Sequence, residues 1–322
     1  MKAAVIMQAG QPPEYRDFAP PSPLAGEHLI TVTAAAMSHV VKSRASGTHY
    51  SSSGQAAFIA GIDGVGRLAD GSRVYFLLPR APYGSMAQSA AAPAAQCVPL
   101  PDGLDDVTAA AIANPGVSSW AAYTLRARLR AGETVLINGA TGTAGRLAVQ
   151  IAKYLGAKKV IATGRNSDAL QALKALGADV ILPLADGERD VDDSFRQQFA
   201  AGVDVVIDYL WGRSAERLLT AAARAGVGAR PVRFVQIGAA GGPDISLPGA
   251  VLRSSAIELM GSGIGSIALD RLVSAAGELL HATLPGGFAI AATPVPLSEV
   301  EQAWPRDDST RRTVFTVAPK TS

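Results

Sequence analysis

The stretch TVLINGATGTAGRLAVQIAKYLG, residues 134–156, decides the fold. Val135 to Ile137 form the short apolar run typical of a parallel strand that is buried on both faces. Gly139, Gly142 and Gly145 follow at a spacing of three, and the apolar positions after them repeat with a helical period. A strand that enters a helix through such a turn leaves the first N–H groups of the helix free for a phosphate. The stretch predicts a dinucleotide-binding turn; the alternative is a tight turn in which the glycines only allow close packing.

The composition is that of a globular protein. A chain of 322 residues, 48% hydrophobic and 17% charged, suggests about two domains and excludes disorder. A net charge of +2 gives little support to a nucleic-acid partner. Cys97 is the single cysteine, no apolar run approaches the ~20 residues of a membrane span, and the apolar N-terminal run is too short for a signal peptide. We therefore expect a soluble cytoplasmic protein with no nucleic-acid or membrane partner.

The first 115 residues or so predict an antiparallel, turn-rich β domain. Clusters of Pro and Gly separate short strand candidates at 3–7, 28–34, 73–77 and 86–90. Asp63–Gly66 and Asp70-Gly71 predict tight turns. Residues 48–54, with three consecutive serines, predict an exposed loop.

From about residue 117 strands and helices alternate. Strands are expected at 135–137, 160–163, 180–182, 203–209, 233–237 and 257–260. Helices are expected at 167–176, with Ser167 as the N-cap, around Phe195, and at 214–225. This rhythm predicts a parallel sheet covered by helices, the doubly wound α/β architecture. After about residue 266, one helix, segment 288–292, a short helix near Val300 and segment 313–317 look like pieces that return to the first domain.

The end of the second strand indicates which nicotinamide cofactor is bound. An acidic side chain here would bind the free ribose hydroxyls of NADH. The sequence instead reads Gly164-Arg165-Asn166 after the strand, with no Asp or Glu before Asp168. The planar cation of Arg165 suits a 2′-phosphate, so the pattern favours NADPH; the alternative is a solvated arginine at a strand end.

Further motifs complete a resemblance that covers essentially the whole chain. They are GIDGVG at 61–66, LPDGL at 100–104 before an alanine-rich helix at 108–113, PGVSSW at 115–120, NGATGTAG at 138–145 and LGAD at 176–179. In this order they resemble the medium-chain dehydrogenase/reductase superfamily, in its zinc-independent quinone oxidoreductase (zeta-crystallin-like) branch. The resemblance implies a GroES-like catalytic domain at 1–115, a Rossmann domain at 116–262, a return to the catalytic domain at 263–322, and an active site between the two domains.

The chain departs from the zinc-dependent members of this superfamily. Ser38 precedes His39 where those enzymes carry a cysteine ligand, and Gly61-Ile62-Asp63 replaces their Gly-His-Glu. Because a catalytic zinc requires about three N, S or O ligands, we expect no metal. Hydride transfer from a reduced nicotinamide to a conjugated acceptor is feasible without a Lewis acid, whereas a simple ketone develops full charge on one oxygen.

The resemblance also implies roles for individual residues. The pyrophosphate would be held by Thr141, Gly142, Thr143 and Ala144, and the 2′-phosphate by Arg165 and Asn166, with Gly164 leaving room. Ser118 and Gly238 would lie near the nicotinamide, and Asp208, Gly261 and Gly263 would be further cofactor neighbours. Tyr50 and Ser38 are the candidate catalytic residues. Tyr50 could protonate the reduced acceptor or be an exposed loop aromatic. Ser38 stands where related reductases often have Asn, and Val41 where they often have Asp.

These observations predict an NADPH-dependent reductase of quinones or α,β-unsaturated carbonyl compounds, acting by direct hydride transfer. The alternative is a non-catalytic NADPH-binding protein with a regulatory or structural role. Family members are often homodimers joined along the edges of their Rossmann sheets, and the strands at 233–237 and 257–260 are candidates for that edge.

Overall fold

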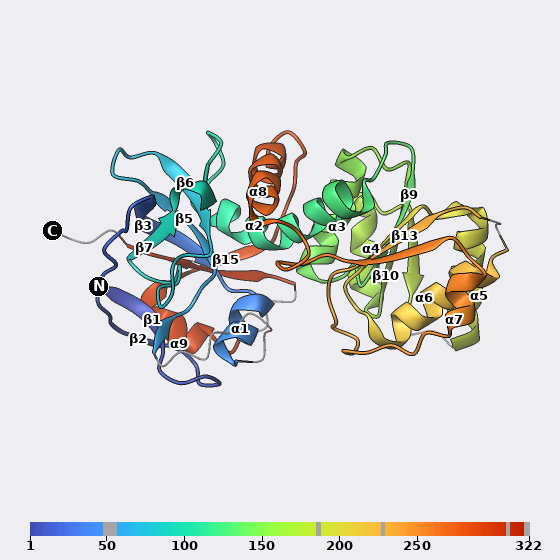
Figure 1. The fold of residues 1–322 in the computed structure, drawn as a ribbon, viewed down its shortest axis with the longest axis horizontal. Coiled ribbons are helices and arrows are strands. Elements are labelled where there is room, and N and C mark those ends of the chain that lie inside the picture. The colour runs from blue at the N-terminus through green and yellow to red at the C-terminus, as the bar shows by residue number, and fades with distance from the viewer. Residues whose placement is uncertain (48–56, 185–187, 227–228, 307–309, 319–322) are drawn as a thin grey trace. The chain divides into compact units, whose positions relative to one another are not determined.

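The computed structural model describes residues 1–47, 57–184, 188–226, 229–306 and 310–318. The chain divides into two compact units, of which unit 1 comprises 1–114 with 269–322 and unit 2 comprises 115–268. The red C-terminal elements therefore lie among the blue and cyan strands of unit 1 (Figure 1). No helix in the described part of the chain is both long and apolar enough to cross a bilayer.

Unit 1 is built on antiparallel β-structure. Its strands are β1 (Lys2–Ile6), β2 (Glu14–Asp17), β3 (Glu27–Ala36), β4 (Phe58–Ile59), β5 (Asp63–Arg67), β6 (Arg73–Leu77), β7 (Ser89–Pro93), β8 (Cys97–Pro99), β15 (Ala292–Pro296) and β16 (Arg312–Thr316). One sheet has the order β2-β1-β4, and the larger one has the order β15-β16-β3-β5-β6-β8, with β7 also paired to β3. The pairing of β16 with β3 ties the end of the chain to its beginning, with Phe315 opposite Ala35.

Helices complete unit 1. They are α1 (His39–Ala45), η1 (Ala94–Gln96), α8 (Leu269–Thr283), η4 (Leu297–Glu299) and α9 (Val300–Ala303), and α2 (Asp106–Ala121) leads from this unit into the next. Side chains from both ends of the sequence share one core, in which Ile30 and Phe76 pack in the same cluster as Val300 and Phe315, all fully buried. Burial of such side chains stabilises the fold by about 1.5–3 kcal/mol each.

Glycines shape the centre of the larger sheet, where the predicted turn at Asp63–Gly66 was wrong. These residues form β5, which pairs with both β3 and β6. A Cβ atom on Gly66 would lie 2.4 Å from the backbone oxygen of Thr31, so the neighbouring strand approaches too closely for a side chain. The glycines thus permit close strand packing instead of a turn. The predicted turn at Asp70-Gly71 is confirmed, with φ +85° at Gly71.

Unit 2 contains one parallel sheet. Its strands are β9 (Thr134–Asn138), β10 (Lys159–Gly164), β11 (Val180–Pro183), β12 (Val205–Asp208), β13 (Val232–Gln236) and β14 (Ile257–Gly261). They are ordered β11-β10-β9-β12-β13-β14, and every pairing is parallel. The order reverses direction between β9 and β12, which is where doubly wound sheets bind ligands at the carboxyl ends of their strands. The predicted fold class, an antiparallel β domain with a doubly wound α/β domain, is confirmed.

Helices cover this sheet. They are η2 (a π-helical segment, Ala122–Ala127), α3 (Thr143–Tyr154), α4 (Ser167–Ala172), η3 (Leu173–Leu176), α5 (Glu188–Gly202), α6 (Gly212–Arg224) and α7 (Gly249–Arg253). Helices α5, α6 and α7 form a packed group beside the strands (Figure 1). Phe195 and Phe199 from α5 share a buried cluster with Leu218 of α6 and Phe234 of β13. The apolar faces of α5 and α6 are therefore buried against the sheet, as the helical period of their sequences predicts.

Three local predictions shift by a few residues. The cap of α4 is Asn166, whose side chain accepts a hydrogen bond from the N–H of Ala169 at 2.9 Å, and not Ser167. The strand expected at 86–90 lies at Ser89–Pro93, and the segment expected at 288–292 forms its strand at Ala292–Pro296. Alanine-rich or proline-rich segments carry weak periodic patterns, and pairing with a partner strand fixes their limits.

Candidate cofactor-binding site

The glycine turn between β9 and α3 has the geometry of an anion site. Gly139 adopts φ +85°, and Gly142 occupies the N-cap position of α3 without any side-chain capping bond. The helix therefore begins at Thr143 with backbone donors that no capping side chain satisfies, at the positive end of its dipole. A Cβ on Gly145 would lie 2.5 Å from the Cα of Ala140, so close packing of helix on turn also requires glycine there. Close packing thus accounts for Gly145, and phosphate binding at this turn stays a prediction.

The end of β10 lies directly beside this turn. A Cβ on Gly164 would come within 2.5 Å of the Thr141 Cγ2 atom. Arg165 follows with an exposed side chain, and among the described residues its guanidinium makes no hydrogen bond or ion pair. Asn166 uses its side-chain oxygen to cap α4, which leaves the amide as its donor. Asp168 is the first carboxylate beyond the strand, in the first turn of α4. An exposed cation beside an uncapped helix start fits an anionic ligand.

Asp208, a predicted cofactor neighbour, lies at the end of β12 and is completely buried. Its carboxylate accepts hydrogen bonds from the Asn138 side chain at 2.8 Å and from the backbone N–H groups of Leu210 and Trp211 at 3.0 and 3.1 Å. Burial raises the pKa of this carboxyl, and the hydrogen bonds from these donors act against that shift. Asp208 thus holds the loop after β12 in place, and its contact with a cofactor stays a prediction.

Asn138 joins three strand ends in the same network. Its side-chain oxygen accepts hydrogen bonds from the hydroxyls of Thr163 at 2.7 Å and Ser214 at 2.9 Å. The Thr163 hydroxyl in turn accepts the N–H of Gly139 at 3.1 Å. The glycine turn is therefore anchored to β10 and α6 through side-chain hydrogen bonds, which fix the turn before any ligand binds.

The remaining candidates of unit 2 lie along the same edge of the sheet. Gly238 follows β13, and its N–H donates to the Asp208 carbonyl at 3.2 Å. Gly261 ends β14, where its carbonyl accepts the Arg126 Nε–H at 2.8 Å, and the N–H of Gly263 donates to the Ser266 hydroxyl at 2.8 Å. Parallel strands bring these strand ends to one edge of the sheet, and their contact with a cofactor stays a prediction.

Ser118 reaches this edge from α2 and leads to two residues that sequence reasoning missed. Its hydroxyl donates to the Pro115 carbonyl at 2.7 Å. The hydroxyl of the adjacent Ser119 lies 2.7 Å from that of Tyr209, which directly follows β12. The signal for Tyr209 was its place one residue after a buried strand-end carboxylate, since the residues at that point border the crevice of a doubly wound sheet.

The candidates of unit 1 have a different status. Ser38 is almost fully buried and caps α1, because its hydroxyl accepts the N–H of Val41 at 3.1 Å. Tyr50 lies outside the described residues, as does the whole predicted serine-rich loop at 48–54. Among the described side chains, no three His, Cys, Asp or Glu residues are grouped as metal ligands.

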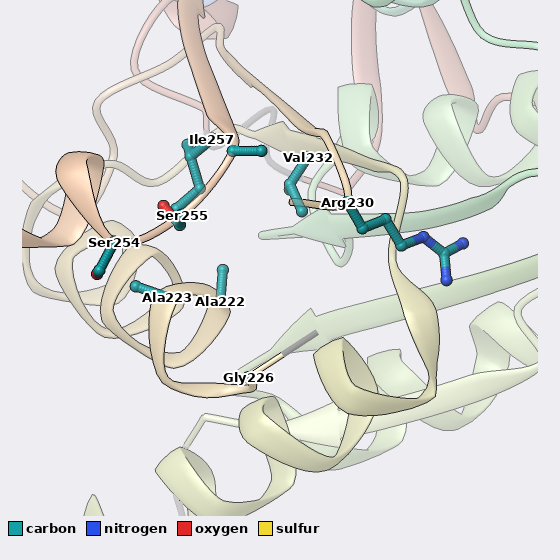
Figure 2. Close-up of a pocket in the computed structure, with 9 residues that line it drawn as sticks. Ala222, Ala223, Gly226, Arg230, Val232, Ser254, Ser255 and Ile257 are labelled. Carbon is teal, nitrogen blue, oxygen red and sulfur yellow. The ribbon is translucent and has the colours of Figure 1, made fainter. Parts of the chain in front are cut away.

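A cavity of about 240 Å³ lies elsewhere in unit 2, beside the start of β13 and β14 (Figure 2). Ala222, Val232, Ser255 and Ile257 are among its lining residues. The Arg230 side chain extends away from the alanines in Figure 2 and pairs with Asp204 at 2.7 Å. The cavity thus lies at the amino end of the strands, and Arg230, the one charged side chain among the described residues that line it, is already paired.

Comparison with known proteins agrees with this geometry. The sequence pattern of the family described as "Zinc-binding dehydrogenase" matches residues 144–279. The probable NADPH-dependent quinone reductase tdiC of Emericella nidulans is 29% identical over 99% of this chain and 100% of its own length. The trans-enoyl reductase pgmF of Aspergillus terreus is 29% identical over 31% of this chain and 28% of its own length. Other matched segments cover only 8% and 6% of much longer polyketide synthases of Mycobacterium tuberculosis.

Among solved structures, the quinone oxidoreductase of Thermus thermophilus, which was determined together with its NADPH complex, is 28% identical. It superposes with a TM-score of 0.80 over 98% of this chain and 100% of its own. Fold, motif order and these relatives agree. Together they support the resemblance of this chain to the zinc-independent quinone oxidoreductase branch of the medium-chain dehydrogenase/reductase superfamily.

Proposed function

We propose that this protein is an NADPH-dependent reductase that transfers a hydride to quinones or α,β-unsaturated carbonyl compounds without a metal ion. The observation that carries the proposal is the edge of the unit 2 sheet, where an uncapped helix start adjoins the exposed Arg165 and no carboxylate precedes Asp168. The quinone reductase tdiC and the Thermus enzyme, whose names refer to NADPH, support the same cofactor.

In this proposal, different residues at this edge of the unit 2 sheet bind different parts of NADPH. The N–H groups at Thr143 and Ala144 donate to the pyrophosphate, with Thr141 and Gly142 shaping the turn around it. Arg165 and the Asn166 amide donate to the 2′-phosphate, for which Gly164 leaves room. Ser118 and Gly238 border the nicotinamide, and Asp208, Gly261 and Gly263 border the rest of the cofactor. When bound, NADPH supplies the hydride, and the protein supplies position and polarity.

The class of acceptor follows from charge. A quinone or an enone spreads the incoming electron pair over several atoms, so its reduction develops less charge on one oxygen than the reduction of a saturated ketone. Tyr50 is the proposed proton donor to the reduced acceptor, and Ser38 a proposed polar neighbour of that acceptor. The trans-enoyl reductase pgmF, named for an enoyl acceptor, supports the enone half of the proposal.

We further propose a cytoplasmic homodimer. The lone Cys97 gives no sign of an oxidising compartment. Strand β14 pairs only with β13 among the described strands, and its Leu259 side chain is 38% exposed. An uncovered parallel edge with exposed apolar side chains favours pairing with a second copy. Light scattering of the wild-type protein and of Leu259→Lys tests this, since a monomeric wild type contradicts it.

Cofactor consumption at 340 nm tests the function. Purified protein is mixed with NADPH or NADH and with simple quinones, enones and saturated ketones, and cofactor binding is titrated by nicotinamide fluorescence in parallel. Oxidation of NADPH with quinones or enones but not ketones is the expected result. Tight NADPH binding without turnover on any acceptor would favour a non-catalytic binding protein, and failure to bind either cofactor would overturn the proposal.

A further inference from the structure

Tyr209 lies at the carboxyl ends of the unit 2 strands, where it contacts several of the candidate cofactor-binding segments. Its N–H donates to the Asn138 carbonyl at 3.0 Å, so its backbone is tied to the end of β9. Its own carbonyl accepts the N–H of Ala240 at 3.2 Å, and a Cβ on Gly238 would lie 2.7 Å from that carbonyl oxygen. The loop after β13 therefore packs directly on the Tyr209 backbone. This packing fixes the position from which the tyrosine side chain extends.

The Tyr209 hydroxyl connects this point to α2. It lies 2.7 Å from the Ser119 hydroxyl, which is 3.2 Å from the same Pro115 carbonyl that accepts the Ser118 hydroxyl. Ser119 is completely buried, and its hydroxyl is 3.4 Å from the carbonyl of Ala144, the residue that also contributes to the glycine turn. A single phenol thus links the strand end, the turn and the two serines.

The hydrogen-bonding capacity of the Ser118 hydroxyl determines which group of the cofactor it can bind. A serine hydroxyl has one proton and two acceptor lone pairs. The Ser118 proton is directed at the Pro115 carbonyl, 2.7 Å away. Toward any other neighbour Ser118 can therefore only accept. On the nicotinamide ring the carboxamide NH₂ is the group that donates.

We propose that Tyr209 is a positioning residue for the nicotinamide: together with Ser119 it fixes the Ser118 hydroxyl so that a Ser118 lone pair faces the carboxamide NH₂. This inference rests on the proposed function, because it takes Ser118 to border the ring. It assigns no chemical step to Tyr209. In this proposal the Tyr209 phenol orients the Ser118 hydroxyl, and the nicotinamide contacts that hydroxyl.

The test compares two oxidised cofactors. NADP⁺ carries the carboxamide, whereas its 3-acetylpyridine analogue has a methyl group in place of the NH₂. Wild-type protein should bind NADP⁺ about 3- to 10-fold more tightly than the analogue, the range of one net hydrogen bond. In Tyr209→Phe this ratio should fall close to one, and kcat with NADPH should fall by about 10-fold because the ring is no longer held in one orientation.

Two further variants separate positioning from stability. Tyr123→Phe removes another buried tyrosine hydroxyl, which donates to the Ala148 carbonyl at 3.1 Å, and should lower Tm without changing the ratio of affinities. Ser118→Ala should lower the ratio by itself, and its combination with Tyr209→Phe should lower it no further. Independent, additive losses would overturn the inference, because Tyr209 would then act by another route.

The outcomes distinguish this inference from the function on which it rests. If wild-type protein binds neither NADP⁺ nor NADPH, the proposed function fails and the inference with it. If wild-type protein binds and oxidises NADPH but Tyr209→Phe keeps the wild-type ratio, the role of Tyr209 alone is overturned.

Discussion

Replacement of Arg165 by alanine tests the cofactor preference most directly. The side chain is exposed at the end of β10 and has no partner among the described residues, so its removal breaks no contact of the fold there. The free energy of unfolding of Arg165→Ala should therefore lie within about 0.5 kcal/mol of the wild-type value, as is usual for substitutions at surface positions. Any change in NADPH affinity then reports on the contact with the cofactor.

The expected loss follows from the kind of contact. A hydrogen bond to a charged group contributes about 1.5–3 kcal/mol, which corresponds to roughly 10- to 100-fold in affinity. Because Arg165 is solvent-exposed, screening by salt places the loss toward the lower end, about 10- to 30-fold at 0.15 M ionic strength. The difference between wild type and variant should shrink further as salt is added.

Fluorescence titration with NADPH and NADH measures this loss. Arg165→Ala should weaken NADPH binding and leave NADH binding unchanged, because NADH lacks the 2′-phosphate. Arg253→Ala is a matched control, since it removes an exposed arginine of unit 2 that precedes β14 and thus lies at the opposite end of the strands. Unchanged NADPH affinity in Arg165→Ala would refute the assignment of Arg165, and an equal loss for both nucleotides would point to damage of the whole site.

Three further changes test other parts of the chain. Gly145→Ala places a Cβ 2.5 Å from the Ala140 Cα, so it should cost about 1–3 kcal/mol in urea denaturation and weaken NADPH binding as the turn shifts. Asn166→Ala removes the cap of α4 and should cost about 0.5–2 kcal/mol in the same assay, whereas Asn166→Ser, which can still cap, should lose little. Burial raises the pKa of Asp63 from 3.8 to about 6, so the folded state binds this proton more tightly than the unfolded state. The free energy of unfolding should therefore fall as the pH rises from about 4 to 6, by roughly 3 kcal/mol, and Asp63→Asn should remove that decline; an unchanged pH profile in this variant would contradict the assignment.

Much of unit 2 could be predicted because its signals are local. Apolar runs at β9 and β12 and the glycine spacing after Asn138 identify strands and turn without knowledge of their neighbours. Parallel order then brings their carboxyl ends to one edge, so Gly164, Gly238 and Gly261 follow from the architecture. A candidate site formed by strand ends can therefore be predicted from the sequence pattern.

What sequence reasoning missed depends on contacts between distant residues. Gly64 and Gly66 resemble a turn in sequence because the residues around them carry no sign that β3 packs closely against them. Asn166 and Ser167 are both good caps, and the turn geometry decides which of them serves. Tyr209 gained its place in the site through Ser119, 90 residues earlier in the chain. Pairings of that kind have no periodic signal.

The return of residues 269–322 to unit 1 has a consequence for biosynthesis. Strand β16 pairs with β3, and Val300 and Phe315 complete the core around Ile30 and Phe76. Unit 2, by contrast, is formed from one continuous segment. A ribosome that releases the chain from its N-terminus therefore delivers all of unit 2 while unit 1 still lacks part of its core. Residues 1–114 therefore keep part of their apolar strand surface uncovered until residues 269–322 have been synthesised.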